Sequence, residues 1–386
     1  MYMRYFALPS NTSTIGIHNI DISSCNNVND KNHICYSLVD SLKKNKNKID
    51  KYILQWEKVK KYTNTYEFIH TQIPYYKVAV SKYKPISRSY FKMVEILNNF
   101  KLTKKFGPSI ETFHLAEGPG GFIEAIANAR KNKSDIYTGI TLVDNTSNIP
   151  NWNKCKDIMK KYPNIKLDYG SSGTGDILLP INLKYCFMKY KNRMDLITAD
   201  GGFDFSSDFN NQEKLACNLI FAEICFAILM QKKGGSFIIK FFDIFNFASI
   251  DLLYLLSFFY NSVTITKPCT SRIANSEKYV VCEDFKYDDS EPFYYVFYNV
   301  FSIYDLRKVN VYRFLNMPIP TVFMNKIKEI NYILGQFQIE NINTTIELIL
   351  NEKSDDKLEN YRKKNVSKCI DWCIKNSVLY NSFNIA

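Results

Sequence analysis

The feature that most constrains the fold is an alternation of short apolar runs with helical patterns along the middle of the chain. Helical patterns lie at 121–131, 212–233 and 248–260, and the helix over 212–233 is expected to end at Gly234-Gly235. Strands alternating with helices predict an α/β fold with a doubly wound, mostly parallel sheet and helices on both faces. The apolar runs that predict its strands lie at 112–116, 136–143, 165–168, 194–199, 236–242, 262–266 and 278–283.

The segments on either side of this region do not show the alternation of strand and helix patterns. Residues 1–80 are rich in Asn, Lys, Ser and Ile and predict an N-terminal extension or subdomain. Residues 81–289 are expected to form the α/β domain, which opens with a helix that follows Ser87. Residues 290–386 predict a C-terminal helical appendage, with helices over 325–349 and 357–379.

Composition narrows the classes of function. The 50 Lys and Arg residues against 38 Asp and Glu give a net charge of +12, which favours a polyanionic partner, although a solvated lysine-rich face explains it equally well. The ten cysteines form no CxxC pair, which argues against a zinc site and a disulfide-stapled secreted domain, so we expect no metal. Polar residues interrupt the most apolar stretches, 215–230 and 241–260, and the first residues do not resemble a signal peptide, so no membrane association is expected.

A glycine-rich turn follows the first predicted core strand, where sheets of this class bind ligands. The turn reads Glu117-Gly118-Pro119-Gly120-Gly121-Phe122, and Ile123 stands where the dinucleotide fingerprint has its third glycine. This substitution argues against a nicotinamide dehydrogenase. The acid Glu117 beside the glycines suits a cationic, amine-bearing ligand such as S-adenosylmethionine better than a diphosphate. A tight turn without a ligand is the alternative.

Two further acids follow the next strands and are candidates to bind the same ligand. Asp144 follows the second strand, where an acid accepts hydrogen bonds from ribose hydroxyls, although a turn-capping aspartate is an equally good explanation. Asp176, followed by Ile177, lies in a glycine-rich loop after the third strand and suits an adenine amino group.

Five segments, in the same order, resemble the FtsJ-type ribose 2′-O-methyltransferases, and most of all their cap-specific mRNA branch with its viral members. The segments are SRSYFKM (87–93), EGPGGF (117–122), DLITADGGFD (195–204), GGSFIIK (234–240) and KPCTSRIANSEKYVVC (267–282). The resemblance covers residues 85–285 and implies a Rossmann-like methyltransferase domain that uses S-adenosylmethionine. One departure is Glu117, where the commonest family form has a small residue.

The resemblance also implies a catalytic tetrad, Lys92, Asp200, Lys240 and Glu277. A ribose hydroxyl is a weak acid, so its methylation needs a base, for which Lys240 is the candidate. Lys92 would lower the pKa of Lys240, Asp200 would hold its amine beside the methyl donor, and Glu277 would orient Lys92 or the ribose. The two carboxylates oppose the effect of Lys92, and the sequence leaves open which effect is larger. Taken singly, each residue is also an ordinary turn or surface residue.

Candidate RNA contacts lie close to the tetrad in sequence. They are Arg88, Lys267, Ser271, Arg272 and Asn275. The resemblance implies the 5′ end of capped mRNA as the substrate and other capping or transcription proteins as partners. The scattered cysteines indicate reduced thiols and hence a cytoplasmic location, with a nucleus or virion as alternatives. The flanking segments are candidates to bind the cap, the RNA end or a partner. Methylation of rRNA or tRNA ribose, and a non-catalytic RNA-binding accessory subunit, stay open as alternative functions.

Overall fold

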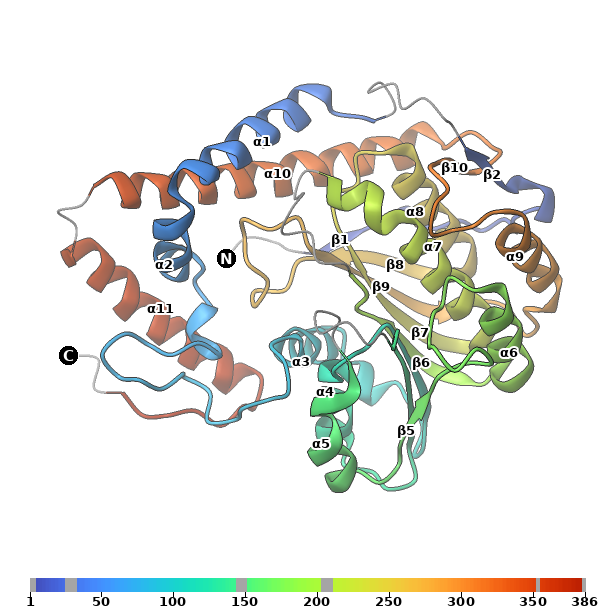
Figure 1. Cartoon of the computed structure of the whole chain (residues 1–386), viewed down its shortest axis with the longest axis horizontal. Coiled ribbons are helices and arrows are strands. Elements are labelled where there is room, and N and C mark those ends of the chain that lie inside the picture. The colour runs from blue at the N-terminus through green and yellow to red at the C-terminus, as the bar shows by residue number, and fades with distance from the viewer. Residues whose placement is uncertain (1–4, 25–32, 144–150, 203–210, 352–354, 384–386) are drawn as a thin grey trace.

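The computed structural model describes residues 5–24, 33–143, 151–202, 211–351 and 355–383, and is built around an eight-stranded sheet (Figure 1). The strand order is β1-β8-β9-β7-β6-β3-β4-β5, and within the described residues only β9 and β1 run against the other six. The predicted doubly wound, mostly parallel sheet is confirmed. Its strands are β1 (Tyr5–Ala7), β3 (Glu111–Leu115), β4 (Ile136–Ile140), β5 (Ile165–Asp168), β6 (Met194–Ala199), β7 (Gln231–Phe241), β8 (Tyr260–Thr266) and β9 (Lys278–Phe285).

Helices cover both faces of the sheet, because alternate residues of each buried strand point to opposite sides. In β7, Phe237 and Ile239 belong to one hydrophobic cluster, whereas Ile238 between them belongs to another. The Ile238 cluster includes residues of α3 (Ser89–Asn99), α4 (Gly121–Arg130) and α5 (Lys156–Lys161). The other includes residues of α6 (Pro180–Tyr190), α7 (Gln212–Met230), α8 (Phe247–Phe259) and α9 (Glu291–Ile303).

The end of α7 differs from the prediction. The helix ends at Met230, and the Gly234-Gly235 pair that was expected to terminate it lies inside β7. Gly234 has a φ of +77°, and the pairing of β6 with β7 shifts register between Met194 and Leu196. The glycines therefore mark an irregularity near the start of a strand, where a positive φ is needed, and not a helix cap.

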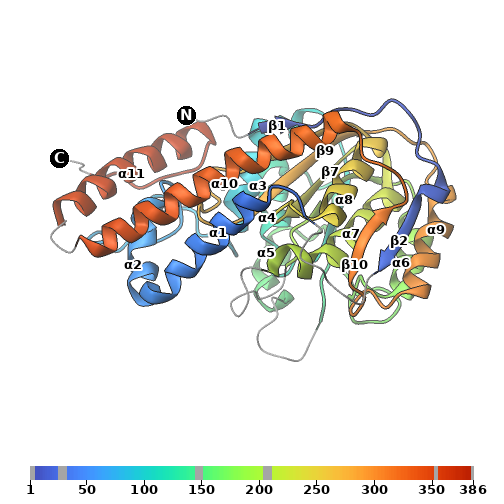
Figure 2. The same ribbon diagram turned by 90° about the horizontal axis from the view of Figure 1, so that it is seen from above.

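The two ends of the chain pack together outside the sheet. Helices α1 (Tyr36–Lys48) and α2 (Ile53–Thr63) contact α10 (Thr321–Leu350), and α2 also contacts α11 (Asp355–Lys375), as Figure 2 shows. Strand β2 (Ile20–Ser24) pairs with β10 (Val311–Leu315) in a separate antiparallel sheet. The domain boundaries at 80/81 and 289/290 stay a prediction.

The structure also has five short 3₁₀ helices within its described residues. They are Ile17–Asn19, Ile49–Tyr52, Glu67–Ile69, Leu102–Lys104 and Trp152–Lys154.

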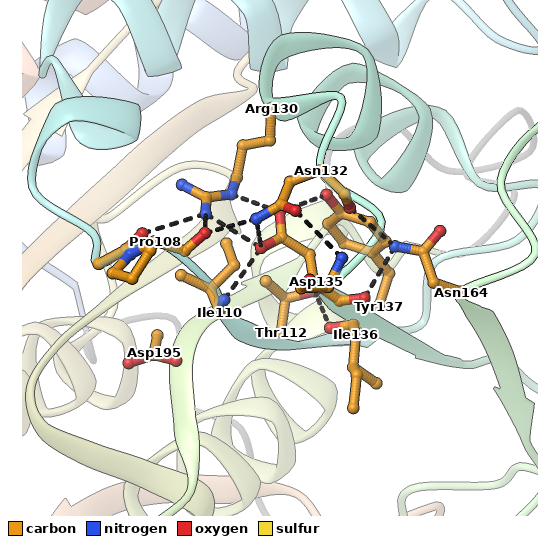
Figure 3. Close-up of polar contacts among 12 residues, drawn as sticks. Pro108, Ile110, Thr112, Arg130, Asn132, Asp135, Ile136, Tyr137, Asn164 and Asp195 are labelled. Carbon is orange, nitrogen blue, oxygen red and sulfur yellow. Dashed lines mark hydrogen bonds and ion pairs between the residues drawn. The ribbon is translucent and has the colours of Figure 1, made fainter.

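A buried polar cluster fixes the edge of the sheet at which β3 and β4 begin (Figure 3). Asp135, directly before β4, is fully buried and is paired with the guanidinium of Arg130 on α4. Its carboxylate also accepts the Ile110 N–H at 3.0 Å and the Tyr137 hydroxyl at 2.8 Å. Burial raises the pKa of Asp135, but these donors outweigh it and the net shift is downward. The carboxylate thus joins α4 to the first residues of two strands.

None of the helices in the described part of the chain is both long and apolar enough to cross a bilayer.

Candidate active site

The sheet explains why distant residues meet at one edge. Asp200 directly follows β6, and Lys240 is the last residue but one of the parallel strand β7. Strand β9 runs antiparallel to β7, so Glu277, directly before β9, lies at the same edge. The carboxyl ends of parallel strands form the usual ligand site of such sheets. Three of the four predicted tetrad residues therefore converge here.

The fourth residue, Lys92, reaches this edge from α3. Its Nζ lies 2.7 Å from Oε2 of Glu277, and the two side chains are only 6% and 14% exposed. Glu277 also accepts the hydroxyl of Ser271 at 2.7 Å. An ammonium this deeply buried requires a partner, and Glu277 is that partner.

Lys240 forms the second lysine–carboxylate pair. Its Nζ lies 3.2 Å from Oδ1 of Asp200 and donates to the Asp200 carbonyl oxygen at 2.7 Å. The hydroxyl of Tyr279 donates to the same carboxylate at 2.8 Å and lies 3.5 Å from Nζ of Lys92, so it connects the two pairs. Tyr279 is opposite Lys240 in the β7–β9 register. Sequence reasoning missed Tyr279, because the register between two strands cannot be read from one sequence.

The sequence left open whether the pKa of Lys240 is lowered by Lys92 or raised by the carboxylates, and the charges around Lys240 decide this. Burial lowers the pKa of Lys240, but the charges of Asp200 and Glu277 outweigh burial, and the net shift is upward. For Glu277, burial raises the pKa, yet Lys92 and Lys240 outweigh it and hold the pKa well below its usual range. With these side chains alone, the carboxylates dominate and keep the lysine protonated.

Glu117 lies in the glycine turn beside this network. Its Oε1 accepts the N–H groups of Phe122 and Ile123 at 2.7 and 3.2 Å, whereas its buried Oε2 has no hydrogen-bond partner among the described residues. Burial, and then the charge of Asp200, raise the pKa of Glu117 well above its usual value. A buried carboxylate oxygen without a donor fits a cationic, amine-bearing ligand, which would supply both the hydrogen bond and the charge.

The loops after β3, β4 and β5 support the turn from one side. The Gly118 N–H donates to the hydroxyl of Thr141 at 3.2 Å, and Val143 donates to the carbonyl of Thr174 at 2.8 Å. Gly120 has a φ of +113°, which a residue with a side chain rarely adopts. Three loops of the same sheet edge are therefore packed against one another.

The other predicted cofactor residues occupy different environments. Pro119 lies within the turn. The side chains of Phe122 and Ile177 are both buried, with 0% and 4% exposure. Asp176 caps its own loop, because its Oδ1 accepts the Leu178 N–H at 2.9 Å. Asp144 lies outside the described residues. A role in ligand binding stays a prediction for each of them.

Gly121 has a structural reason of its own. A Cβ at this position would lie 2.1 Å from the hydroxyl oxygen of Ser89 and 2.2 Å from that of Ser87. The glycine therefore lets the start of α4 pack directly against the start of α3, the helix that carries Lys92.

The predicted RNA contacts divide into two groups. Lys267 is buried and donates to the carbonyls of Asn275 and Glu277 at 2.6 and 2.7 Å, so it holds the loop between β8 and β9. Arg272 forms a two-fold ion pair with the buried Glu67. By contrast, the guanidinium of Arg88 is exposed and has no hydrogen bond or ion pair within the described residues. Asn275 is also exposed, and the buried Ser271 is bonded to Glu277 as described above.

Two buried glutamates near the site were not foreseen. Glu95 on α3 accepts the Cys269 N–H at 2.7 Å and the indole N–H of Trp372 at 3.2 Å, so it ties the β8–β9 loop to α11. Glu223 on α7 lies against Gly201, where a Cβ would come within 2.2 Å of its Oε1. Both residues sit on helices whose apolar pattern predicted core packing. An acid inside the apolar stretch 215–230 was the signal for Glu223, and no such signal marked Glu95.

No group of three or more His, Cys, Asp and Glu side chains suited to a metal ion occurs in the part of the chain that the structure describes.

Comparison with known proteins places this site in a family. The model of the FtsJ-like methyltransferase family matches residues 85–285. A cap-specific mRNA (nucleoside-2′-O-)-methyltransferase 2 from Danio rerio is 36% identical over 212 residues, which are 52% of this chain and 28% of that protein. The Mus musculus protein of the same name is 28% identical over 344 residues, covering 84% of this chain and 43% of that one. A probable methyltransferase of African swine fever virus is 30% identical over 216 residues, covering 51% and 48%.

The matched part of this chain thus spans between a quarter and a half of the length of these relatives.

Proposed function

This chain belongs to the FtsJ-like methyltransferase family, and on that premise we propose that it transfers a methyl group from S-adenosylmethionine to a ribose 2′-hydroxyl near the 5′ cap of mRNA. The names of the vertebrate relatives support the choice of substrate. The observation that carries the proposal is the pair of lysine–carboxylate contacts, Lys92 with Glu277 and Lys240 with Asp200, joined through Tyr279.

The cofactor would lie across the carboxyl edge of the sheet. Its methyl group is activated by attachment to a positively charged sulfur. Glu117 would accept a hydrogen bond from its amino group through Oε2, the oxygen without a partner among the described residues. Asp176 and Ile177, and Asp144 outside the described residues, are the proposed contacts to its nucleoside. Glu117 would ionise as it gains this partner, because an opposite charge favours the carboxylate.

Lys240 would act on the ribose. The positive charge of a cofactor bound beside Asp200 would lower the pKa of Lys240, because a like charge disfavours the ammonium form. The neutral amine would then take the proton of the 2′-hydroxyl as its oxygen accepts the methyl group, and the bond from methyl to sulfur would break to leave a neutral thioether. Lys92, held by Glu277, would present its Nζ to the nucleotide, and Asp200 would keep the Lys240 amine in place.

Further partners and the compartment follow from this proposal. An enzyme that acts on capped mRNA would work beside other capping or transcription proteins, and we propose the cytoplasm as its location, as the sequence predicts.

The test is a methyl-transfer assay with short capped and uncapped RNAs of one sequence, followed by nuclease mapping of the product. We expect labelled methyl on a 2′-oxygen next to the cap and little transfer to the uncapped RNA. Equal transfer to both RNAs would contradict cap specificity and favour an rRNA or tRNA substrate. RNA binding without any transfer would favour the non-catalytic accessory subunit.

A further inference from the structure

Glu223 is a buried acid that the proposed mechanism does not use. It lies within α7, is 1% exposed, and has fully buried apolar neighbours in Ala222 and Ile224. Its Oε1 has no hydrogen-bond partner among the described residues. Burying a polar oxygen without a partner is unfavourable, and an apolar side chain would fill this position of the helix without that cost. The acid therefore needs an explanation other than core packing.

The carboxyl group lies under the turn that follows β6. A Cβ at Gly201 would lie 2.2 Å from Oε1 of Glu223 and 3.1 Å from the Cβ of Ala116. Ala116 is the first residue after β3, and it has a φ of +49°, which a residue with a side chain rarely adopts. Glu223 therefore supports the place where the loops after β3 and β6 contact each other.

The same turn separates Glu223 from Lys240. Gly202 directly follows Gly201, and a Cβ at Gly202 would lie 3.2 Å from Nζ of Lys240. The Nζ atom also donates to the backbone carbonyl of Asp200 at 2.7 Å. One short segment, residues 200–202, therefore contacts the acid through its middle residue and the amine through the other two.

Two charged groups act on Glu223 within the described part of the chain, Lys240 of β7 and Asp200 after β6. Helices α6, α8 and α9 also pack against α7, but none of their described side chains contributes a charge at this position. Burial first, and then Asp200, raise the pKa of Glu223 to about 8, although Lys240 opposes them. The group is therefore mainly uncharged at neutral pH and becomes a carboxylate in alkaline solution.

The charge of Glu223 matters because Lys240 must lose a proton before it can act as the base. Burial lowers the pKa of Lys240, whereas the charges of Asp200, Glu277 and an ionised Glu223 raise it. A third carboxylate beside the amine would hold the proton more firmly, since charges interact strongly where water is excluded. An uncharged Glu223 avoids this effect.

We propose that Glu223 is a positioning residue for the base: at neutral pH it is an uncharged carboxylic acid that supports the 200–202 turn and limits the negative charge around Lys240. It acts through that turn and does not touch the substrate. In alkaline solution the ionised acid holds the proton on Lys240 and restrains methyl transfer. This inference rests on the proposed function and adds a residue outside the five segments on which the resemblance depends.

The test compares Glu223→Gln with Glu213→Gln, which are the same substitution of two buried acids on one helix. Glu213 is 8% exposed and accepts a backbone N–H at 2.7 Å, a bond that glutamine can also accept. The charges that act on Glu213 are those of Asp243 and Lys278, and that of Lys240 is not among them. Single-turnover methyl transfer to a short capped RNA is measured from pH 6 to 10 with saturating S-adenosylmethionine. Circular dichroism checks that both variants are folded.

We expect the wild type and Glu223→Gln to have equal rates below about pH 7, where Glu223 is uncharged. Above about pH 8, Glu223→Gln should be up to about tenfold faster, because a shift of one pKa unit changes the amount of neutral amine tenfold. Glu213→Gln should follow the wild type at every pH. A Glu223→Gln profile that coincides with the wild type would overturn the inference. So would one that lies below it by a constant factor, which is the result of a purely structural role.

A second substitution covers the case in which Glu223→Gln does not fold. Glu223→Met is close in size to the wild type, is uncharged at every pH, and adds no polar group to the buried position. The same separation of rates above about pH 8 is expected, and its absence counts equally against the inference.

The proton on Lys240 can also be followed without catalysis. Acetylation of its amine by trace acetic anhydride, resolved by mass spectrometry, reports the neutral form as a function of pH. The midpoint should lie about one unit lower in Glu223→Gln than in the wild type and should not move in Glu213→Gln.

The two proposals fail in distinguishable ways. If the wild type transfers no methyl group but the midpoint of Lys240 acetylation shifts in Glu223→Gln, the proposed function is wrong and the link between Glu223 and Lys240 stands. If methyl transfer occurs and neither the rate profile nor the acetylation midpoint shifts, the proposed function stands and the inference about Glu223 is wrong.

Discussion

The Nζ atom of Lys240 donates to the backbone carbonyl of Asp200 at 2.7 Å and lies 3.2 Å from its carboxylate. One residue therefore holds the lysine through two separate acceptors, and this residue directly follows β6, the parallel neighbour of β7. Replacing the carboxylate alone leaves the contact with the backbone carbonyl in place. The carbonyl oxygen therefore helps to position the Lys240 amine, whereas the charge of the carboxylate raises its pKa.

Lys240→Ala should abolish methyl transfer while leaving cofactor affinity nearly unchanged, because it removes the proposed base but not the glycine turn. We expect turnover to fall about 10²–10⁴-fold. Single-turnover transfer of labelled methyl measures the rate, and equilibrium dialysis measures cofactor binding. Lys233→Ala is the matched control, since Lys233 lies near the other end of β7 and pairs with the exposed Asp288. Wild-type turnover in Lys240→Ala would remove the base assignment.

Glu223→Gln should change how stability depends on pH. Burial first, and then the charge of Asp200, raise the pKa of Glu223 from 4.5 to about 8. Between these values the folded protein keeps a proton that the unfolded chain releases, so this residue makes stability fall as pH rises. In the glutamine variant this residue cannot titrate, so it contributes no such decrease in stability.

Urea denaturation at a series of pH values from 5 to 8 measures the effect. The free energy of unfolding of the wild type should decline relative to Glu223→Gln across this window. Glu329→Gln changes an exposed acid of α10 that pairs with Lys326 and should alter stability little. Parallel curves for the wild type and Glu223→Gln would show that Glu223 is ionised in the folded state.

The sheet was predictable because its strands are short, mainly apolar segments with turn residues on both sides. The predicted strands at 165–168 and 194–199 coincide with the edge strand β5 and the inner strand β6. The N-terminal helices were not predicted, because α1 buries only Leu38, Leu42 and Asn45 and is otherwise rich in lysine and asparagine. Their packing partner, α10, lies almost three hundred residues further on, and no local pattern carries that information.

The site shows the same division between local and long-range information. Motifs identified Lys92, Asp200, Lys240 and Glu277, and the structure brings all four together. Motifs also assigned Arg272 to RNA, but they contained no sign that the buried Glu67, 205 residues away, binds it. Arg272→Ala would leave that acid buried without its partner, so Arg88 is the safer residue for a test of phosphate binding.

Gly121→Ala should lower both stability and turnover. The added methyl group would overlap the hydroxyls of Ser87 and Ser89 and push α3, with Lys92, away from the sheet edge. Overpacking of this kind costs about 1–3 kcal/mol. Thermal unfolding and the rate of methyl transfer report the two effects.

Two comparisons make this prediction specific. Gly107→Ala is the control, because the nearest atom to its Cβ would be 3.9 Å away. The combination of Gly121→Ala with Ser87→Ala and Ser89→Ala removes the two overlapping hydroxyls and should recover part of the lost turnover. A Gly121→Ala variant as active and stable as Gly107→Ala would mean that α3 does not rest on this glycine.

Asp135→Asn should destabilise the fold without touching the reacting centre. The substitution leaves Arg130, whose side chain is 9% exposed, without its counter-ion at the edge of the sheet where β3 and β4 begin. Loss of one partner of a buried ion pair costs about 3–5 kcal/mol. Because the pKa of Asp135 is lowered in the folded state, its contribution is present at neutral pH and is lost as the solution becomes acidic.

Urea denaturation at pH 7 measures the loss, with Asp305→Asn as the control. Asp305 pairs with Arg307 on the surface, where the side chains are 36% and 53% exposed, so its replacement should cost less than about 1 kcal/mol. Turnover of Asp135→Asn, measured at a temperature at which it remains folded, should equal that of the wild type, because the cluster lies at the opposite edge of the sheet from Lys240. A variant as stable as Asp305→Asn would show that the remaining hydrogen bonds of the cluster suffice to hold α4 against β4.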